Sequence, residues 1–310
     1  MTRKALPLVA MPTDLLQLIV AACAATDLAS VAATSTVMED ISRYRRNKLA
    51  VLIANPFDVE NIHHQRELLW SDKNLGNANF AALSYALGSG ALPQLVHLQL
   101  ARNKIGVQGM AAFADALGKR VLSRCTLLDL SFNMIGDDGM IEFSVALGKR
   151  ALPALNLLVL SNCRISDSGM VALSEAISTG GLANLTFLNL GVNQIGNSGL
   201  SSFLKACGER ALTKLETLYL SFNNIGDAGV SAFADAYPNK VLTNLQRLSF
   251  GSLRGSNNIG DEGMKALAAA CDKEVLPSLK MLIVPLHFLY AIDGLRQLRG
   301  ICKRRDILLA

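Results

Sequence analysis

Asparagine side chains recur at a fixed interval in the middle of the chain. Asn103, Asn133, Asn193 and Asn223 lie on a lattice of 30 residues, and Cys163 occupies the node between the second and third of them. An amide carries both donors and an acceptor, so at a turn it can satisfy backbone groups that would otherwise be buried without partners. We therefore interpret these asparagines as structural rather than catalytic.

Other reactive side chains form no convincing catalytic or metal centre. His63, His64 and Glu67 place three potential ligands within one helical turn, but no cysteine lies near them, and a solvated linker is the favoured interpretation. The Gly-x-x-Gly pairs are turns of a repeat and lack the pattern of a phosphate-binding loop. We expect no catalytic residue, no metal and no cofactor, and the chain is predicted not to be an enzyme.

Each asparagine belongs to the same repeated unit of about thirty residues, which is expected to include a strand and a helix. One unit has the following repeated residues: Leu215, Leu218, Leu220, Asn223, Ile225, Gly226 and Gly229. Alternating leucines before the turn predict a short strand, and Met110, Phe113 and Leu117 after it follow the spacing of a helical face. One unit buries six or seven apolar side chains at roughly 1.5–3 kcal/mol each, whereas ordering its backbone costs about 1–2 kcal/mol per residue. The units must therefore stack.

The pattern L-x-x-L-x-L-x-x-N-x-I-G-D-x-G resembles the leucine-rich repeat, and the long period is similar to the ribonuclease-inhibitor-like subclass. The resemblance implies an α/β fold, a curved horseshoe solenoid with parallel strands inside and helices outside. We expect a degraded first repeat over residues 65–91, six clear repeats over 92–271 and a C-terminal cap over 272–310. Phe113, Phe143 and Phe203 should stack along one spine. The following residues are expected to cap helix N-termini, while Val107 is not: Asp137, Asp167, Asn197, Asp227 and Asp261.

Residues 1–64 lie off the repeat lattice and are expected to form a separate helical module. Their pattern resembles the F-box, with Met11, Asp14, Ile19, Asp27 and Leu28 in register. The resemblance implies a substrate receptor of a cullin-type ubiquitin ligase. The residues implied to dock a Skp-type adaptor are Met11, Pro12, Leu15, Leu16, Ile19 and Leu28. Two alternatives stay open, a targeting peptide and a structural cap on the first repeat.

A protein target is expected on the inner face of the sheet. Side chains two and four residues after each opening leucine point away from the helices, and the first turn residue lies beside them. The predicted partner-binding residues are Leu127, Asp129, Phe132, Leu157, Val159, Phe187, Asn189, Tyr219, Phe222 and Arg247. A contiguous apolar patch of this kind marks an interaction site. The alternative is that Phe132 and Phe222 fold inward against the turns.

Composition agrees with a folded, soluble protein. Half of the 310 residues are hydrophobic and 18% are charged, and no uncharged apolar run approaches the roughly 18 residues of a membrane span. The net charge of +5 is concentrated after Lys280, so no basic array for nucleic acid runs along the repeats. We expect a monomer that binds neither nucleic acid nor membrane.

The cysteines indicate a reducing compartment. Cys207 and Cys271 stand where other repeats carry apolar core residues, which favours free thiols over disulfides. We predict a cytoplasmic protein, with nuclear localisation as an open alternative. A second functional hypothesis is a regulator of a small GTPase, because the subclass is similar to Ran GTPase-activating proteins. This chain ends in basic residues rather than the acidic run typical of that family. A general signalling scaffold is a further alternative.

Overall fold

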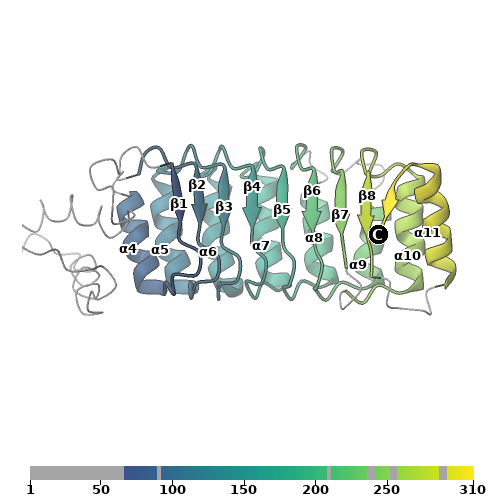
Figure 1. Cartoon of the computed structure of the whole chain (residues 1–310), viewed down its shortest axis with the longest axis horizontal. Coiled ribbons are helices and arrows are strands. Elements are labelled where there is room, and N and C mark those ends of the chain that lie inside the picture. Colours follow the sequence, from purple (N-terminus) through teal and green to yellow (C-terminus); the bar gives the residue numbers. More distant parts are fainter. Residues whose placement is uncertain (1–65, 89–91, 208–210, 236–241, 252–256, 286–291) are drawn as a thin grey trace, which may run out of the picture.

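The computed structural model describes residues 66–88, 92–207, 211–235, 242–251, 257–285 and 292–310. Short strands alternate with helices along the whole of this part (Figure 1). The strands are β1 Glu67–Leu69, β2 His97–Gln99, β3 Leu127–Asp129, β4 Leu157–Val159, β5 Phe187–Asn189, β6 Thr217–Tyr219, β7 Arg247–Ser249, β8 Met281–Ile283 and β9 Leu308–Leu309. The helices are α4 Asn77–Gly88, α5 Val107–Gly118, α6 Gly136–Gly148, α7 Asp167–Ser178, α8 Asn197–Cys207, α9 Asp227–Asp235, α10 Asp261–Asp272 and α11 Ile292–Arg304.

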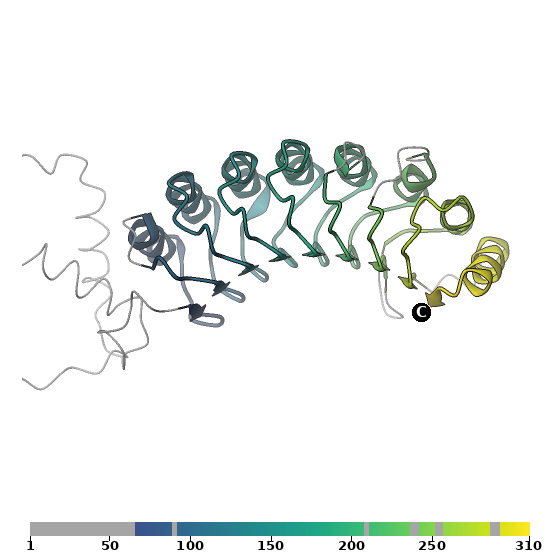
Figure 2. The same cartoon turned by 90° about the horizontal axis from the view of Figure 1, so that it is seen from above.

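The nine strands form one parallel sheet in sequence order. Equivalent residues of successive repeats pair directly, so that Leu127 lies opposite Leu157 and Leu157 opposite Phe187. Figure 2 shows the strands along the inner side of an arc and the helices along its outer side. The arrangement follows from size, because a helix with its side chains is wider than the spacing of paired strands. The predicted solenoid is confirmed.

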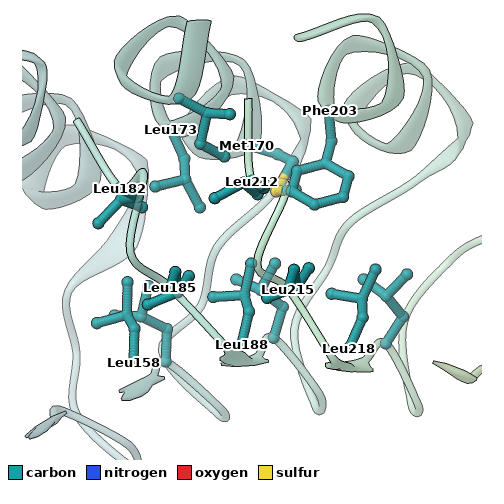
Figure 3. Close-up of a cluster of buried hydrophobic side chains, with 14 of the residues drawn as sticks. Leu158, Met170, Leu173, Leu182, Leu185, Leu188, Phe203, Leu212, Leu215 and Leu218 are labelled. Atoms are coloured by element: carbon teal, nitrogen blue, oxygen red, sulfur yellow. The ribbon is translucent and has the colours of Figure 1, made fainter. Parts of the chain in front are cut away.

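The core lies between the sheet and the helices and is continuous from repeat to repeat. One column contains the equivalent helix residues Phe113, Phe143, Leu173, Phe203 and Phe233, all with no exposed surface, and Phe80 of α4 packs against its first ring. The ring centroids of Phe80 and Phe113 lie 5.0 Å apart, and those of Phe113 and Phe143 lie 6.1 Å apart. Leu173 continues the column towards Phe203, above the leucines of the strands (Figure 3). The predicted spine therefore exists, with a leucine at one node.

The asparagine side chains connect neighbouring turns, as predicted. The Asn133 carboxamide oxygen accepts the backbone N–H of Ile105 at 3.0 Å, and its nitrogen donates to the carbonyls of Leu100 and Leu130 at 3.0 and 2.8 Å. Asn103, Asn193 and Asn223 make the same type of bonds. Asn257, displaced by the extra residues of its repeat, still accepts from Ile225 N–H at 2.9 Å. Each amide therefore satisfies buried backbone groups of two repeats.

The predicted acidic and amide residues do cap helix N-termini, and each side chain caps the helix of the following repeat. Asp167, the first residue of α7, accepts the N–H groups of Gly196 and Gly199 at the start of α8, at 2.6 and 3.0 Å. Asn197 does the same for Gly226 and Gly229. In α7 itself the N-cap is Ser166. The caps therefore act between repeats, since the stacking of helices brings each first turn beside the next one.

Four further side chains cap the next helix in the same way, and the whole series forms a ladder of caps. Asn77 accepts from Gly106 and Gly109, and Asp137 from Ser166 and Gly169. Asp227 accepts from Gly260, and Asp261 from Gly294. Lys265 and the Gly294 amide lower the pKa of the Asp261 carboxyl. Anionic side chains at these places also lie at the positive ends of the helix dipoles.

One junction between repeats interrupts both the ladder of caps and the series of asparagine amides. Val107 offers no acceptor to the start of α6, and Cys163 stands in place of an asparagine in the turn that follows. There α6 begins at Gly136, whose φ is +65°, and the Gly136 N–H donates to the carbonyl of Cys163 at 2.9 Å. The Cys163 thiol contacts the carbonyl of Leu130 at 3.2 Å. A positive φ that glycine adopts without strain lets this turn close without the usual side chains.

The C-terminal end of the solenoid contains more repeat structure than the sequence suggested. Leu298 and Cys302 of α11 are buried against α10, and Arg296, Arg299 and Lys303 face solvent, as the pattern of that segment predicted. Strand β9 then adds to the sheet, and the Leu308 N–H donates to the carbonyl of Lys280 at 2.8 Å. In the described part of the chain, no helix combines the length and apolar character that a membrane span needs.

Candidate functional site

The candidate site is the concave face, which is the surface of the sheet that points away from the helices. Leu127, Leu157 and Phe187 form one row across β3, β4 and β5, and each is half-buried. Val159 and Tyr219 belong to the second row and are also half-buried. Because alternate strand residues such as Leu128, Leu158 and Leu188 are fully buried, the core is complete without the outward rows.

Beside the sheet, the first residue of each turn projects apolar or cationic groups into solvent. The φ angles of Arg102, Phe132, Asn162, Val192 and Phe222 lie between 52° and 57°. Phe132, Val192 and Phe222 are 39%, 44% and 41% exposed. The left-handed conformation is disfavoured for residues with a Cβ, most of all for a β-branched residue such as Val192. The alternative in which the two phenylalanines fold inward is excluded.

Two aromatic contacts order this surface. The rings of Phe187 and Tyr219, on adjacent strands, have centroids 5.6 Å apart and planes inclined by 58°. The Arg102 guanidinium lies 4.5 Å from the centre of the Phe132 ring, a cation–π geometry. Cross-strand aromatic pairs are worth about 0.5–1.5 kcal/mol beyond burial, so the side chains are held in place before any partner arrives.

The polar side chains of the face are occupied by their own backbone. The Asp129 carboxylate accepts the N–H of Ser131 at 2.9 Å and the Ser131 hydroxyl at 2.6 Å. The side-chain amide oxygen of Asn189 accepts the N–H of Gly191 at 2.9 Å. Because these groups already have partners, a protein surface can cover them at a smaller desolvation cost than unpaired polar groups would impose.

The ends of the concave face are charged. His97 on β2 lies 2.9 Å from the Glu67 carboxylate on β1, and Arg247 on β7 is exposed. The apolar centre is therefore flanked by charged groups at both ends, the arrangement of a core and rim in protein interfaces.

All ten residues predicted for partner binding lie on this face or its turn edge, half-buried or exposed. The sequence places Val192 in the same turn row as Phe132 and Phe222, but the predicted binding residues did not include it, although it completes the exposed edge between them. Its position in the repeat is the signal that could have identified it, because it is the turn residue equivalent to the two phenylalanines. The six predicted adaptor-docking residues, from Met11 to Leu28, lie outside the described residues, as do His63 and His64.

In the described part of the chain, no metal-ligand cluster is present and the cysteines lie in the core. Within it, no group of three His, Cys, Asp or Glu side chains is placed to hold a metal ion. Cys125, Cys163, Cys207, Cys271 and Cys302 are free and buried. Burial raises the pKa of the Cys125 and Cys163 thiols to about 12, so both stay protonated and unreactive at neutral pH.

The repeats can now be compared with known proteins. A model of the leucine-rich repeat family matches residues 92–114, 126–144, 153–174, 181–204, 211–234 and 255–268. The chain contains leucine-rich repeats. The first five matched segments cover the strand, the turn and the first part of the helix of successive repeats, and the sixth covers the Asn257 turn and the first part of α10.

Among solved structures, the crystal structure of internalin C2 from Listeria monocytogenes resembles this chain. The similarity covers 65% of this chain and 76% of that chain, with 21% sequence identity and a TM-score of 0.36. No curated protein matches the sequence.

Proposed function

We propose that this chain is a protein-binding module whose leucine-rich repeats hold a partner on the concave face. The observation that carries the proposal is the exposed edge Phe132, Val192 and Phe222 beside the apolar rows of β3 to β6. Exposed aromatic clusters are typical of interfaces, and solenoids use their concave surfaces for binding. Non-glycine residues in left-handed turns at this edge add weight, because strained positions are found at functional sites.

We further propose that residues 1–64 couple the repeats to a ubiquitin ligase through a Skp-type adaptor. The F-box-like pattern of Met11, Pro12, Leu15, Leu16, Ile19 and Leu28 supports this role. In this proposal the concave face selects the target, and the first module brings it to the ligase in the cytoplasm or nucleus. Buried free thiols favour such a reducing compartment.

One experiment on the full chain tests both parts. The variant Phe187→Asp/Tyr219→Asp should lose a partner captured from source cells and retain the purified adaptor, because only the concave face changes. Leu15→Glu/Leu16→Glu should lose the adaptor and retain the partner. Val145→Asp/Val171→Asp is the matched control, since these exposed apolar residues lie on α6 and α7.

The unfolding free energy of Phe187→Asp/Tyr219→Asp should fall by about 2–4 kcal/mol, the sum of the aromatic pair at about 0.5–1.5 kcal/mol and the partial burial of the two rings. Capture retained by this variant would contradict the concave site, and a much larger loss of stability would show that the two rings belong to the core. Adaptor binding by Leu15→Glu/Leu16→Glu, or none by the unchanged chain, would contradict the coupling role alone.

A further inference from the structure

A second surface lies where α5 and α6 end and the chain turns back towards β3 and β4. We call it the basic rim: Lys119, Arg120, Arg124, Lys149 and Arg150, all exposed. Within the described residues none of the five takes part in an ion pair. The connections 118–126, 148–156 and 178–186 contain no aspartate or glutamate. The rim therefore carries an uncompensated positive charge.

The helix ends explain only part of this cluster. Lys119 and Lys149 are the C-cap residues of α5 and α6, where a cation interacts favourably with the helix dipole. Arg124 lies well beyond the last turn. Arg120 and Arg150 follow these caps directly, so the dipole favours a cation at four of the five positions without requiring arginine at any of them.

Arg120 and Arg150 occupy a backbone position that favours glycine. Their φ angles are 56° and 57°, and the equivalent residue of the next repeat is Gly180, with φ 78°. All three close the helix in the same way, because their N–H groups donate to the carbonyls of Leu117, Leu147 and Ile177 at 2.7–2.9 Å. Glycine is the usual residue at this left-handed helix terminus, since a Cβ is disfavoured there. The Arg150 guanidinium donates to the carbonyl of Thr179 at 3.4 Å, whereas the Arg120 side chain makes no bond among the described contacts. Helix closure alone therefore does not explain both arginines, which points to a use for their charge.

We infer that the basic rim binds an acidic segment, rich in aspartate and glutamate, of the protein held on the concave face. The inference rests on the proposed function, and it adds the chemical character of the partner. The connections that carry the rim lead directly into Leu127 and Leu157, the first residues of β3 and β4. A partner lying on those strands therefore reaches the rim with an adjoining segment. Three of the five cations are arginines, whose planar guanidinium matches a carboxylate with two parallel hydrogen bonds.

The apolar surface beside the rim favours a protein over a nucleic acid. The position of Arg120 and Arg150 carries Gly180 in the next repeat, Arg210 and Lys240 in the two after it and Glu274 near the C-terminal end, so its cations do not form an unbroken row. Nucleic acids require cations arrayed along the phosphate backbone. The neighbouring concave face is apolar, and one protein chain can supply both its side chains and carboxylates.

The test uses the full chain and a fluorescently labelled peptide of alternating glutamate and glycine. Its binding, followed by fluorescence anisotropy at low ionic strength, should weaken about three- to tenfold in Arg120→Gly/Arg150→Gly, as expected for two exposed ion pairs. Raising the salt to about 0.15 M should weaken binding by the unchanged chain, because exposed charges are screened beyond about 8 Å. The thermal midpoint of the variant should stay the same or rise, since glycine relieves the left-handed strain.

Arg164→Gly is the matched control. Arg164 is exposed and has φ 62°, but it lies in the strand-to-helix turn, at the opposite end of the strands from the rim. Its removal should leave peptide binding within about twofold of the unchanged chain. Phe187→Ala/Tyr219→Ala adds no charge and should also bind the peptide normally, so failure of the concave site is distinguishable from failure of the rim.

Three outcomes would overturn the inference. The first is equal peptide affinity in Arg120→Gly/Arg150→Gly and the unchanged chain, and the second is an equal loss in Arg164→Gly. The third is tighter binding of single-stranded DNA or phosphatidylserine vesicles than of the peptide, which would assign the rim to a phosphate-bearing ligand.

Discussion

Replacing Asn133 tests the view that buried amides hold the repeats together. Asn133 is 3% exposed and contacts four backbone groups, but the groups depend on it unequally. The carbonyl of Leu100 also accepts from Asn103 at 2.9 Å, and the carbonyl of Ser131 accepts from the N–H of Arg102. The N–H of Ile105 has no other acceptor among the described contacts. Asn133→Ala therefore leaves one buried donor without a partner.

The expected loss of stability follows mainly from that one unpaired N–H. An unpaired buried N–H costs about 1–3 kcal/mol, and the small cavity left by the amide adds about 1 kcal/mol, so Asn133→Ala should destabilise the chain by about 2–4 kcal/mol. Asn133→Cys should cost about 1–2 kcal/mol less. Cys163 shows why, because its thiol contacts the carbonyl of Leu130 and the preceding turn closes through Gly136 with a positive φ. Gly106 is the equivalent glycine before Asn133 and can adopt the same turn.

Urea unfolding of the full chain, followed by far-ultraviolet circular dichroism, gives the comparison. Asn224→Ala is the control, since Asn224 is the exposed neighbour of Asn223, and its replacement should change the unfolding free energy by less than about 0.5 kcal/mol. If Asn133→Ala were no more costly than Asn224→Ala, the amides would not be the connectors between turns. If Asn133→Cys were as costly as Asn133→Ala, the explanation of the Cys163 junction would fail.

Two further predictions follow from the caps and the buried thiols. Asp167→Ala should lower the free energy of unfolding by about 0.5–2 kcal/mol, and hydrogen exchange should become faster at the Gly196 and Gly199 amides of α8 rather than at the start of α7. Faster exchange confined to α7 would contradict capping between repeats. The control is Asp138→Ala, because Asp138 is exposed. For the thiols, burial raises the folded-state pKa of Cys125 from 9.0 to about 12, so the unfolded chain loses this proton first and stability should fall as pH rises from 9 towards 12. Cys125→Ala should show a shallower decline in urea titrations across that range, and an equal decline would refute the assignment.

The repeat period made the fold predictable. Equivalent residues of parallel strands pair directly, so a period of 30 residues also specifies which side chains stand beside one another. Leu127, Leu157 and Phe187 could be placed in one row for this reason, and Phe113 could be placed beside Phe143. The predicted face required only the alternation of strand residues, because the leucines between the outward residues fill the core.

Contacts that depend on distances between elements were beyond sequence reasoning. Asp167 precedes a glycine in its own repeat, and nothing in the spacing shows that the adjacent helix lies closer to its carboxylate. The pairing of β9 with β8 depends likewise on where α11 directs the chain. The exposure of Val192 depends on a left-handed φ, which an apolar β-branched residue does not indicate from its type.

The two proposed surfaces share one structural device. Phe132 and Val192 at the turns, and Arg120 and Arg150 at the helix ends, all occupy left-handed positions that glycine would fill with less strain. The asparagine amides and inter-repeat caps satisfy the backbone around the turns, so the side chain at such a position can change without breaking the stack. Binding residues on this solenoid are therefore separable from the residues that hold it together. That separation is why substitution of the rim arginines by glycine is expected to remove affinity while preserving stability.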